Sequence, residues 1–126
     1  MTIVKGTICS RGLGHMSRRM CEYADVFERA TGERLIKGTI NVDVGEEITI
    51  NEDFRIRGSE INEPDQDLLF ERCRINGFRA YRIRPLDAMG KGGWGDHIIE
   101  ITCSEEIRPN SPGTQVEIAF FPMDQR

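Results

Sequence analysis

The sequence predicts a small, closed, mostly β barrel with one main α-helix. Six or seven short segments rich in β-branched and aromatic residues alternate with turn signals, whereas apolar residues recur at convincing helical spacing in one stretch. Hairpins and short turns between the segments favour a barrel over an open parallel sheet, which needs further helices to cover its faces. At 126 residues the chain has the size of one domain, so we expect a single domain over residues 1–126.

The individual elements are expected in order along the chain. The main helix takes Ser17 as its N-cap and Gly32 as its C-terminal stop, because apolar residues from Met20 onward recur at helical spacing. Residues 104–109 are expected to form a short capped turn or helix. Strands rich in β-branched residues are expected at residues 2–10, 38–44, 46–50, 53–58, 97–103 and 113–121.

The clearest hairpin covers residues 68–86. Asn76-Gly77 is the dipeptide typical of a two-residue turn, and pairing around it places Ile75 opposite Phe78 and Glu71 opposite Arg82. The arginines of this hairpin form either a basic patch or an alternating solvent face with acidic partners, and the second interpretation is preferred. These arginines are Arg72, Arg74, Arg79, Arg82 and Arg84.

Charge and cysteine content exclude several classes of protein. Lys and Arg number 17 against 21 Asp and Glu, a net charge of −4, which argues against a protein that coats nucleic acid. The four cysteines contain no Cys-x-x-Cys pair, and the N-terminus lacks the pattern of a signal peptide. No apolar run reaches the roughly 20 residues of a membrane span. We therefore expect a cytoplasmic protein with reduced cysteines and no membrane partner.

A glycine-bearing segment follows the first strand. Gly12 and Gly14 with Ser17 approach the dinucleotide-binding fingerprint, but the third glycine is missing and no further long amphipathic helix follows Asp43. A narrower hypothesis remains, because backbone N–H groups that lead into a helix N-terminus can bind phosphate on any fold. A tight strand-to-helix turn is the simpler alternative.

Several segments together resemble the archaeal-type CTP-dependent riboflavin kinase family, in the same order along the chain. The most specific of them is the Gly-Thr-x-Asn motif that follows the helix. The resemblance implies a six-stranded cradle-loop (RIFT-like) barrel that transfers the γ-phosphoryl group of CTP to riboflavin, giving FMN and CDP with Mg²⁺ as cofactor. Separately from the resemblance, we expect a monomer. The segments are "KGTICSRGLG", "DVFERATG", "KGTINVDV", "IIEITCSEEIRP" and "GTQVEI".

The resemblance assigns the metal site to Thr39 and Asn41, which lie on the same side of an extended chain. Mg²⁺ prefers oxygen ligands and keeps several waters, so two neutral protein oxygens suffice when nucleotide phosphates supply the negative charge. Without the neighbouring motifs, Thr39 is an ordinary strand residue and Asn41 satisfies a local turn.

The resemblance also implies a phosphate-binding segment, in which backbone donors bind the triphosphate and an arginine, Arg18 or Arg19, adds positive charge. Family members commonly carry a further glycine and an arginine here, and the side chain at Met16 would crowd the phosphates. This departure supports an alternative function, a non-catalytic flavin- or nucleotide-binding barrel of the same descent. The segment consists of Gly12, Leu13, Gly14, His15, Met16 and Ser17.

Glu100 is the implied catalytic residue on the riboflavin side, where a carboxylate could hold a ribityl hydroxyl or assist removal of its proton. The alternative interpretation is that Glu100 simply faces solvent, on a strand whose residues alternate between the core and solvent. Gly92 stands where the family has a hydroxyl residue at the flavin, and Trp94 either covers the isoalloxazine ring or packs under the glycine-rich loop.

The segment after that strand matches the part of the family that reads the nucleotide base. Backbone groups and a carboxylate can recognise the donor and acceptor pattern of cytosine, and an acidic turn capped by Ser104 is compatible with that role. The residues are Glu105, Glu106, Ile107 and Arg108. A dimeric DNA-binding regulator with a swapped hairpin is a third hypothesis, which the acidic net charge disfavours.

Overall fold

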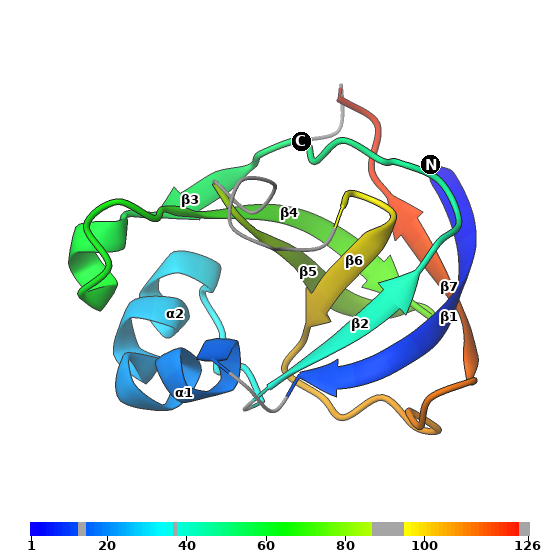
Figure 1. Ribbon diagram of the computed structural model, residues 1–126, viewed down its shortest axis with the longest axis horizontal. Coiled ribbons are helices and arrows are strands. Elements are labelled where there is room, and N and C mark those ends of the chain that lie inside the picture. Colours follow the sequence, from blue (N-terminus) through cyan, green and yellow to red (C-terminus); the bar gives the residue numbers. More distant parts are fainter. Residues whose placement is uncertain (13–14, 37, 87–94, 124–126) are drawn as a thin grey trace.

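The computed structural model describes residues 1–12, 15–36, 38–86 and 95–123. Within these residues the chain forms a closed barrel of six antiparallel strands, one additional short strand, two α-helices and a short 3₁₀ helix, η1 (Gly58–Ile61) (Figure 1). The helices are α1 (His15–Glu22) and α2 (Ala24–Thr31). The strands are β1 (Thr2–Gly12), β2 (Thr39–Asp43), β3 (Phe54–Ile56), β4 (Leu68–Ile75), β5 (Phe78–Pro85), β6 (Ile98–Thr102) and β7 (Gln115–Phe120).

The barrel strands follow the order β4-β5-β6-β2-β1-β7, and β7 closes the ring by pairing with β4. The long strand β1 pairs with two strands: its first half pairs with β7 and its second half with β2. Strand β3 pairs with β4 and stands outside the ring. The predicted small, closed, mostly β barrel is thereby confirmed.

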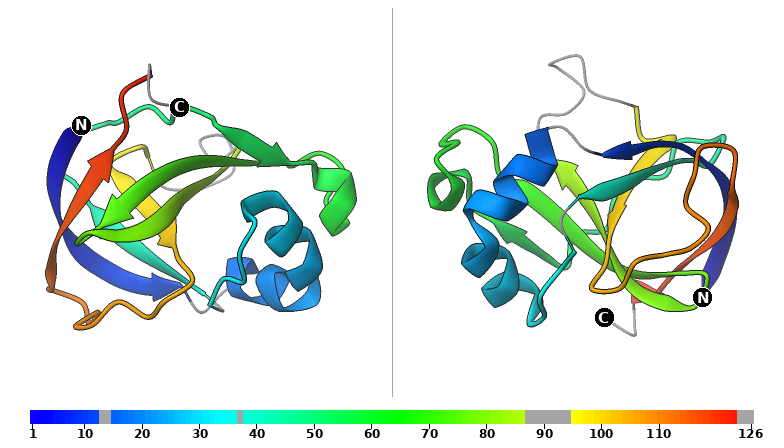
Figure 2. Two further views of the ribbon diagram at one scale, coloured as in Figure 1. Left: turned by 180° about the vertical axis from the view of Figure 1, so that it is seen from behind. Right: turned by 90° about the horizontal axis from the view of Figure 1, so that it is seen from below.

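Two apolar clusters stabilise the fold. Strand residues such as Val42, Ile99 and Ile118 point inward and fill the barrel. A second cluster, which contains Phe27 and Phe70, lies between the outer face of β4 and β5 and the two helices. Figure 2 shows both helices packed on one side of the barrel. Strands β4 and β5 are consequently covered on both faces over part of their length.

The predicted single helix is divided at Tyr23, whose φ of −120° and ψ of 38° are not helical. Gly32 ends α2 as predicted, with a φ of 81° and an N–H that donates to the Glu28 carbonyl at 2.8 Å. The prediction of Ser17 as N-cap is wrong, because α1 already begins at His15. Met16 packs into the cluster beneath the helices, so the apolar face of the helix extends before Ser17.

The β4–β5 hairpin confirms the prediction in register as well as in position. Asn76 and Gly77 have φ values of 49° and 85°, as a two-residue turn with positive φ at both positions requires. Ile75 lies opposite Phe78 and Glu71 opposite Arg82.

Two other predicted elements are absent. Residues 46–50 are irregular and are not part of a strand ladder. Ile48 packs partly buried against the barrel core, and its N–H donates to the Asp96 carbonyl at 3.1 Å. Residues 104–109 form bends and no helix, and the side chain of Ile107 is drawn into the barrel core. Neither α-helix in the described part of the chain is long and apolar enough to cross a membrane.

The interpretation of the hairpin arginines as a solvent face is wrong for Arg82. Arg82 and Glu71 point into the barrel and are 2% and 1% exposed. Arg82 Nη2 lies 3.4 Å from Asp96 Oδ1, and Arg84 Nε donates to the same oxygen at 2.7 Å. Glu71 Oε1 accepts the Asn51 N–H at 3.0 Å. These groups form a buried polar cluster that connects residues 51 and 96 to the barrel wall.

Candidate functional site

The predicted residues Thr39, Asn41 and Glu100 meet on the outer face of β2 and β6. Ile40 and Ile101 fill the barrel, so the residues next to them in sequence point away from it. Asn41 lies directly opposite Glu100 in the β2–β6 ladder. Thr39 Oγ1 donates a hydrogen bond to Glu100 Oε2 at 2.7 Å. Residues separated by 61 positions thus form one polar cluster.

Ser10 on β1 is a member of this cluster that the sequence analysis missed. It lies opposite Asn41 in the β1–β2 ladder, and Asn41 Nδ2 donates to Ser10 Oγ at 2.8 Å. This bond uses the amide nitrogen and leaves the side-chain oxygen Oδ1 of Asn41 without a partner among the described residues. A sequence signal for Ser10 would have required the strand register, which includes an irregularity between Ile8 and Ser10.

Glu100 is half-buried, so the solvent-facing alternative is wrong. Burial raises its pKa above the ordinary value of 4.5, and the hydrogen bond from Thr39 and the positive charge of Arg19 offset only part of this effect. Glu100 is therefore a better proton acceptor than an exposed glutamate.

Arg19 on α1 is the cationic side chain that acts electrostatically on Glu100. Its side chain is buried, with the residue 7% exposed, and Nη2 lies 2.6 Å from Glu63 Oε1. Its Nε atom is buried and has no hydrogen-bond partner within the described residues. A buried guanidinium with an unsatisfied N–H is a potential donor to an anion.

The remaining residues of the predicted phosphate-binding segment are only partly described. Gly12 lies opposite Thr39 at the end of β1, so the start of the segment adjoins the predicted metal ligands. His15 is exposed, and its Nε2 lies 3.1 Å from Glu63 Oε1. A cavity of about 200 Å³ between α1 and η1 is lined in part by His15, Arg18 and Arg19.

Ser17 lies within the first turn of α1. Met16 is buried in the cluster beneath the helices, so its side chain is directed into the core and the expectation that it crowds bound phosphates is wrong. Four predicted contacts, at Leu13, Gly14, Gly92 and Trp94, lie outside the described residues.

The predicted base-reading segment begins three residues after the end of β6 at Thr102. Glu106 and Arg108 are exposed and form an ion pair of 2.8 Å with each other. Glu105 is also exposed, whereas Ile107 belongs to the barrel core. Within the described residues, neither Glu105 nor Arg108 forms a hydrogen bond or an ion pair with a side chain of the Thr39 cluster.

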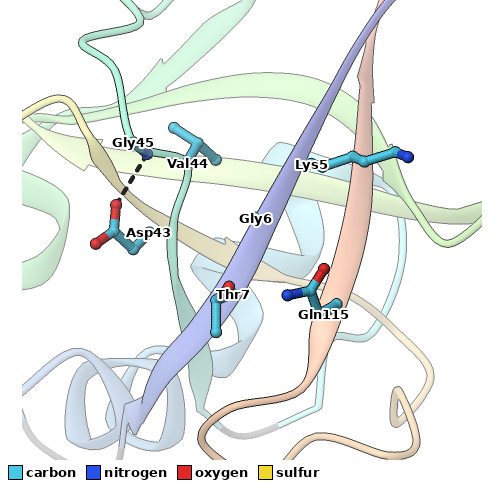
Figure 3. Close-up of a pocket in the computed structure, with 7 residues that line it drawn as sticks. All are labelled: Lys5, Gly6, Thr7, Asp43, Val44, Gly45 and Gln115. Atoms are coloured by element: carbon cyan, nitrogen blue, oxygen red, sulfur yellow. Dashed lines mark hydrogen bonds between the residues drawn. The ribbon is translucent and has the colours of Figure 1, made fainter.

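Another hollow, of about 400 Å³, lies on β1 between β2 and β7 (Figure 3). Lys5 and Thr7 line it, and Gln115 projects toward it from β7. The Asp43 carboxylate accepts the Gly45 N–H at 2.9 Å, which holds the turn after β2. None of the predicted site residues lines this hollow, so it has no part in the candidate site.

The donor set of Thr39, Asn41 and Glu100 fits a hydrated hard cation. The Thr39 proton is directed to Glu100, so the lone pairs of Oγ1 remain for a ligand, and Asn41 contributes a neutral carbonyl oxygen. The described residues contain no cluster of three or more His, Cys, Asp or Glu side chains that could hold a metal ion. A cation here would need further oxygens from water or from a ligand such as a polyphosphate.

Comparison with models of known protein families finds no matching family, and comparison with curated proteins finds no similar sequence. The structure defines a small antiparallel barrel with a polar cluster on its outer wall. A functional assignment rests on that geometry and on the motifs that form it.

Proposed function

We propose that the protein is a CTP-dependent riboflavin kinase, which transfers the γ-phosphoryl group of CTP to riboflavin and gives FMN and CDP. One observation carries this proposal. The resemblance assigns Thr39 and Asn41 on one segment and Glu100 on another to the same reaction, and the three side chains lie in a single cluster. Phosphoryl transfer requires a phosphate-binding segment, a cation and a group that positions the acceptor hydroxyl. Each of these has a candidate in or next to the cluster.

Thr39 and Asn41 would hold Mg²⁺ through one oxygen each, with water and nucleotide phosphates completing its coordination. The ion supplies neutralisation of the negative charge on the phosphates. Glu100 orients the Thr39 hydroxyl, because it accepts that proton at 2.7 Å. The end of β1 at Gly12 adjoins Thr39, so phosphates bound there would lie within reach of both groups.

Glu100 is also the candidate acceptor of the riboflavin hydroxyl proton. Its raised pKa makes it a stronger base than an exposed carboxylate, as general-base assistance at neutral pH requires. Glu105 and the adjacent backbone are the candidates for recognition of cytosine. Buried groups that match one base edge are left unpaired by another base, so CTP is expected to be preferred over ATP by more than tenfold.

The direct test is an incubation of the purified protein with riboflavin, Mg²⁺ and each nucleoside triphosphate in turn, with FMN measured by chromatography. The double variant Thr39→Val/Asn41→Leu is expected to lower Mg²⁺-dependent FMN formation at least 100-fold, because both oxygen ligands are lost. Both replacements suit a strand, and circular dichroism verifies that the barrel is retained.

A matched control is Thr7→Val, which makes the same chemical change on β1 in the hollow of Figure 3. It is expected to leave FMN formation unchanged. Full activity in the double variant would refute the ligand assignment, and absence of FMN with every nucleotide would refute the kinase.

A non-catalytic flavin- or nucleotide-binding barrel is the second candidate, favoured by the pairing of Arg19 with Glu63 at 2.6 Å. This ion pair offsets part of the positive charge that would act on the transferred phosphoryl group, while the Nε of Arg19 still lacks a partner within the described residues and can donate to a bound anion. Retention of FMN or nucleotide through purification, without turnover, would favour this candidate.

A further inference from the structure

Three exposed arginines stand on the outer face of the β4–β5 hairpin, beyond the end of α2. Arg72 and Arg74 project from β4, and Arg79 projects from β5. They line a cavity of about 330 Å³, together with Tyr81 and Phe121. We call this cavity the arginine groove.

The arrangement of the arginines is unfavourable in the absence of an anion. Arg74 and Arg79 lie directly opposite each other in the ladder, and Arg72 lies opposite Tyr81 in the adjacent row. Side chains at directly opposed positions have Cβ atoms about 5 Å apart, and like charges there are destabilising. The three arginines are exposed, so packing of the protein core does not explain why three positive charges stand side by side here.

The existing contacts of the three guanidinium groups are weak. Arg79 Nη1 lies 3.4 Å from Glu33 Oε2, and Arg74 Nη1 donates to the Gly77 carbonyl at 3.3 Å. Arg72 lies over the Phe54 ring at 5.0 Å, which leaves its N–H edges for other acceptors.

Glu33 is the acidic side chain of the groove, and it remains ionised at neutral pH. Burial would raise its pKa, but hydrogen bonds from Tyr81, Ser104 and Arg79 lower it below the ordinary value. Its Oε2 accepts the Tyr81 hydroxyl at 2.5 Å. With Glu33 against three arginines, the groove carries a net charge of about +2.

We propose that the arginine groove binds the phosphate group of a small phosphorylated molecule. A phosphate monoester carries a charge of about −1.5 to −2 at pH 7, which matches the groove, and planar guanidinium groups bind phosphate oxygens in pairs. A volume of about 330 Å³ suits a molecule up to roughly the size of a mononucleotide. Glu33 and the net charge of −4 disfavour a long polyanion as the occupant.

The groove is separate from the Thr39 cluster of the proposed kinase site, although Glu33 accepts a hydrogen bond from Ser104, which directly precedes the predicted base-reading segment. Tyr81 lies opposite Thr102 across β5 and β6, and β2 with Thr39 is the next strand beyond β6. Two strand spacings of about 4.8 Å therefore separate the Tyr81 position from the Thr39 strand, and Arg72 lies one strand further still. Binding in the groove does not depend on the kinase proposal.

Isothermal titration calorimetry with inorganic phosphate, pyrophosphate and a nucleoside 5′-monophosphate tests the proposal, with succinate as a carboxylate dianion. At least one phosphorylated probe is expected to bind more tightly than succinate. In Arg74→Gln/Arg79→Gln its Kd is expected to rise about 10- to 100-fold, since two charge-assisted contacts are lost. The variant is expected to fold, because both side chains are exposed.

Arg57→Gln is the matched control, because it removes an exposed arginine next to β3, at the opposite end of β4. It is expected to leave the Kd unchanged. The groove variant is expected to retain the FMN formation of the parent protein, which separates this site from the kinase site. Failure of all three phosphorylated probes to bind would overturn the proposal, and so would equal binding to the groove variant. Binding of heparin or single-stranded DNA without binding of the small probes would identify a polyanion surface instead.

Discussion

At the scale of single residues, the burial of Glu100 lowers the stability of the folded protein at neutral pH and makes its carboxylate a stronger base. Its half-buried carboxylate accepts a hydrogen bond from Thr39, yet burial still raises its pKa. A folded-state pKa above the unfolded value means that the folded protein binds this proton more tightly than the unfolded chain does. The contribution of Glu100 to stability is therefore present at low pH and is lost as pH rises through the raised pKa.

Glu100→Gln should separate these two properties. Glutamine keeps an acceptor for Thr39 and removes the charge, so the variant is expected to be more stable than the parent at pH 7 and no more stable at pH 4. FMN formation is expected to fall about 100-fold or more because the base is lost. Thermal unfolding at both pH values and the FMN assay measure these effects, and lower stability of the variant at pH 7 would contradict the assigned pKa direction.

At the scale of elements, the β4–β5 turn also supports the closing strand β7. The Asn76 N–H donates to the Glu117 carbonyl at 2.8 Å, and Asn76 Oδ1 accepts the Glu117 N–H at 2.9 Å. One residue therefore supplies the positive φ of the turn and two hydrogen bonds to the neighbouring strand.

Substitutions at Asn76 should distinguish these contributions. Asn76→Gly keeps the positive φ and loses the side-chain hydrogen bond, at a cost of about 1 kcal/mol. Asn76→Ala loses that bond and also forces alanine into the left-handed region, for a total of about 2 to 3 kcal/mol. Urea unfolding measures both, and equal destabilisation by the two variants would show that the turn conformation contributes little.

Sequence patterns predicted those elements whose determinants are local. The Asn76-Gly77 turn fixes the register of its own hairpin, and the alternation around Thr39 and Asn41 indicates that they share a face. Apolar and polar residues alternate over 46–50 as they do in a strand. A strand also needs a neighbouring strand to pair with, and the alternation does not show whether one is present. Ser10 was missed for a similar reason, because its place beside Asn41 depends on a register between distant segments.

At the scale of the whole molecule, the barrel contains charge in its interior. Alternation along β5 predicts that Arg82 differs in orientation from its neighbours, but it does not indicate which face is the barrel interior. Both faces of β5 are partly covered, so Arg82 is buried with Glu71 and near Asp96. Burial lowers the pKa of Arg82, which reflects the cost of removing its charge from water.

Arg82→Met is expected to destabilise the barrel by about 3 kcal/mol, because Glu71 loses a compensating charge in the interior. The double variant Glu71→Leu/Arg82→Met is expected to recover much of that loss. Chemical denaturation of the parent, both single variants and the double variant gives the coupling energy between the two sites. Additive effects would indicate that Asp96 alone compensates Arg82.

The pairing of β1 with β7 has a consequence for how the chain reaches its native state. Thr2 lies opposite Phe120, so the ring closes between segments far apart in the sequence. Contacts of such large sequence separation slow folding, because the entropy of a long loop is lost before the contacts form. During synthesis on the ribosome, one edge of β1 has no native neighbour until β7 has emerged. Until then it offers exposed backbone donors and acceptors, and chaperones that shield nascent strands are expected to raise the yield of folded protein.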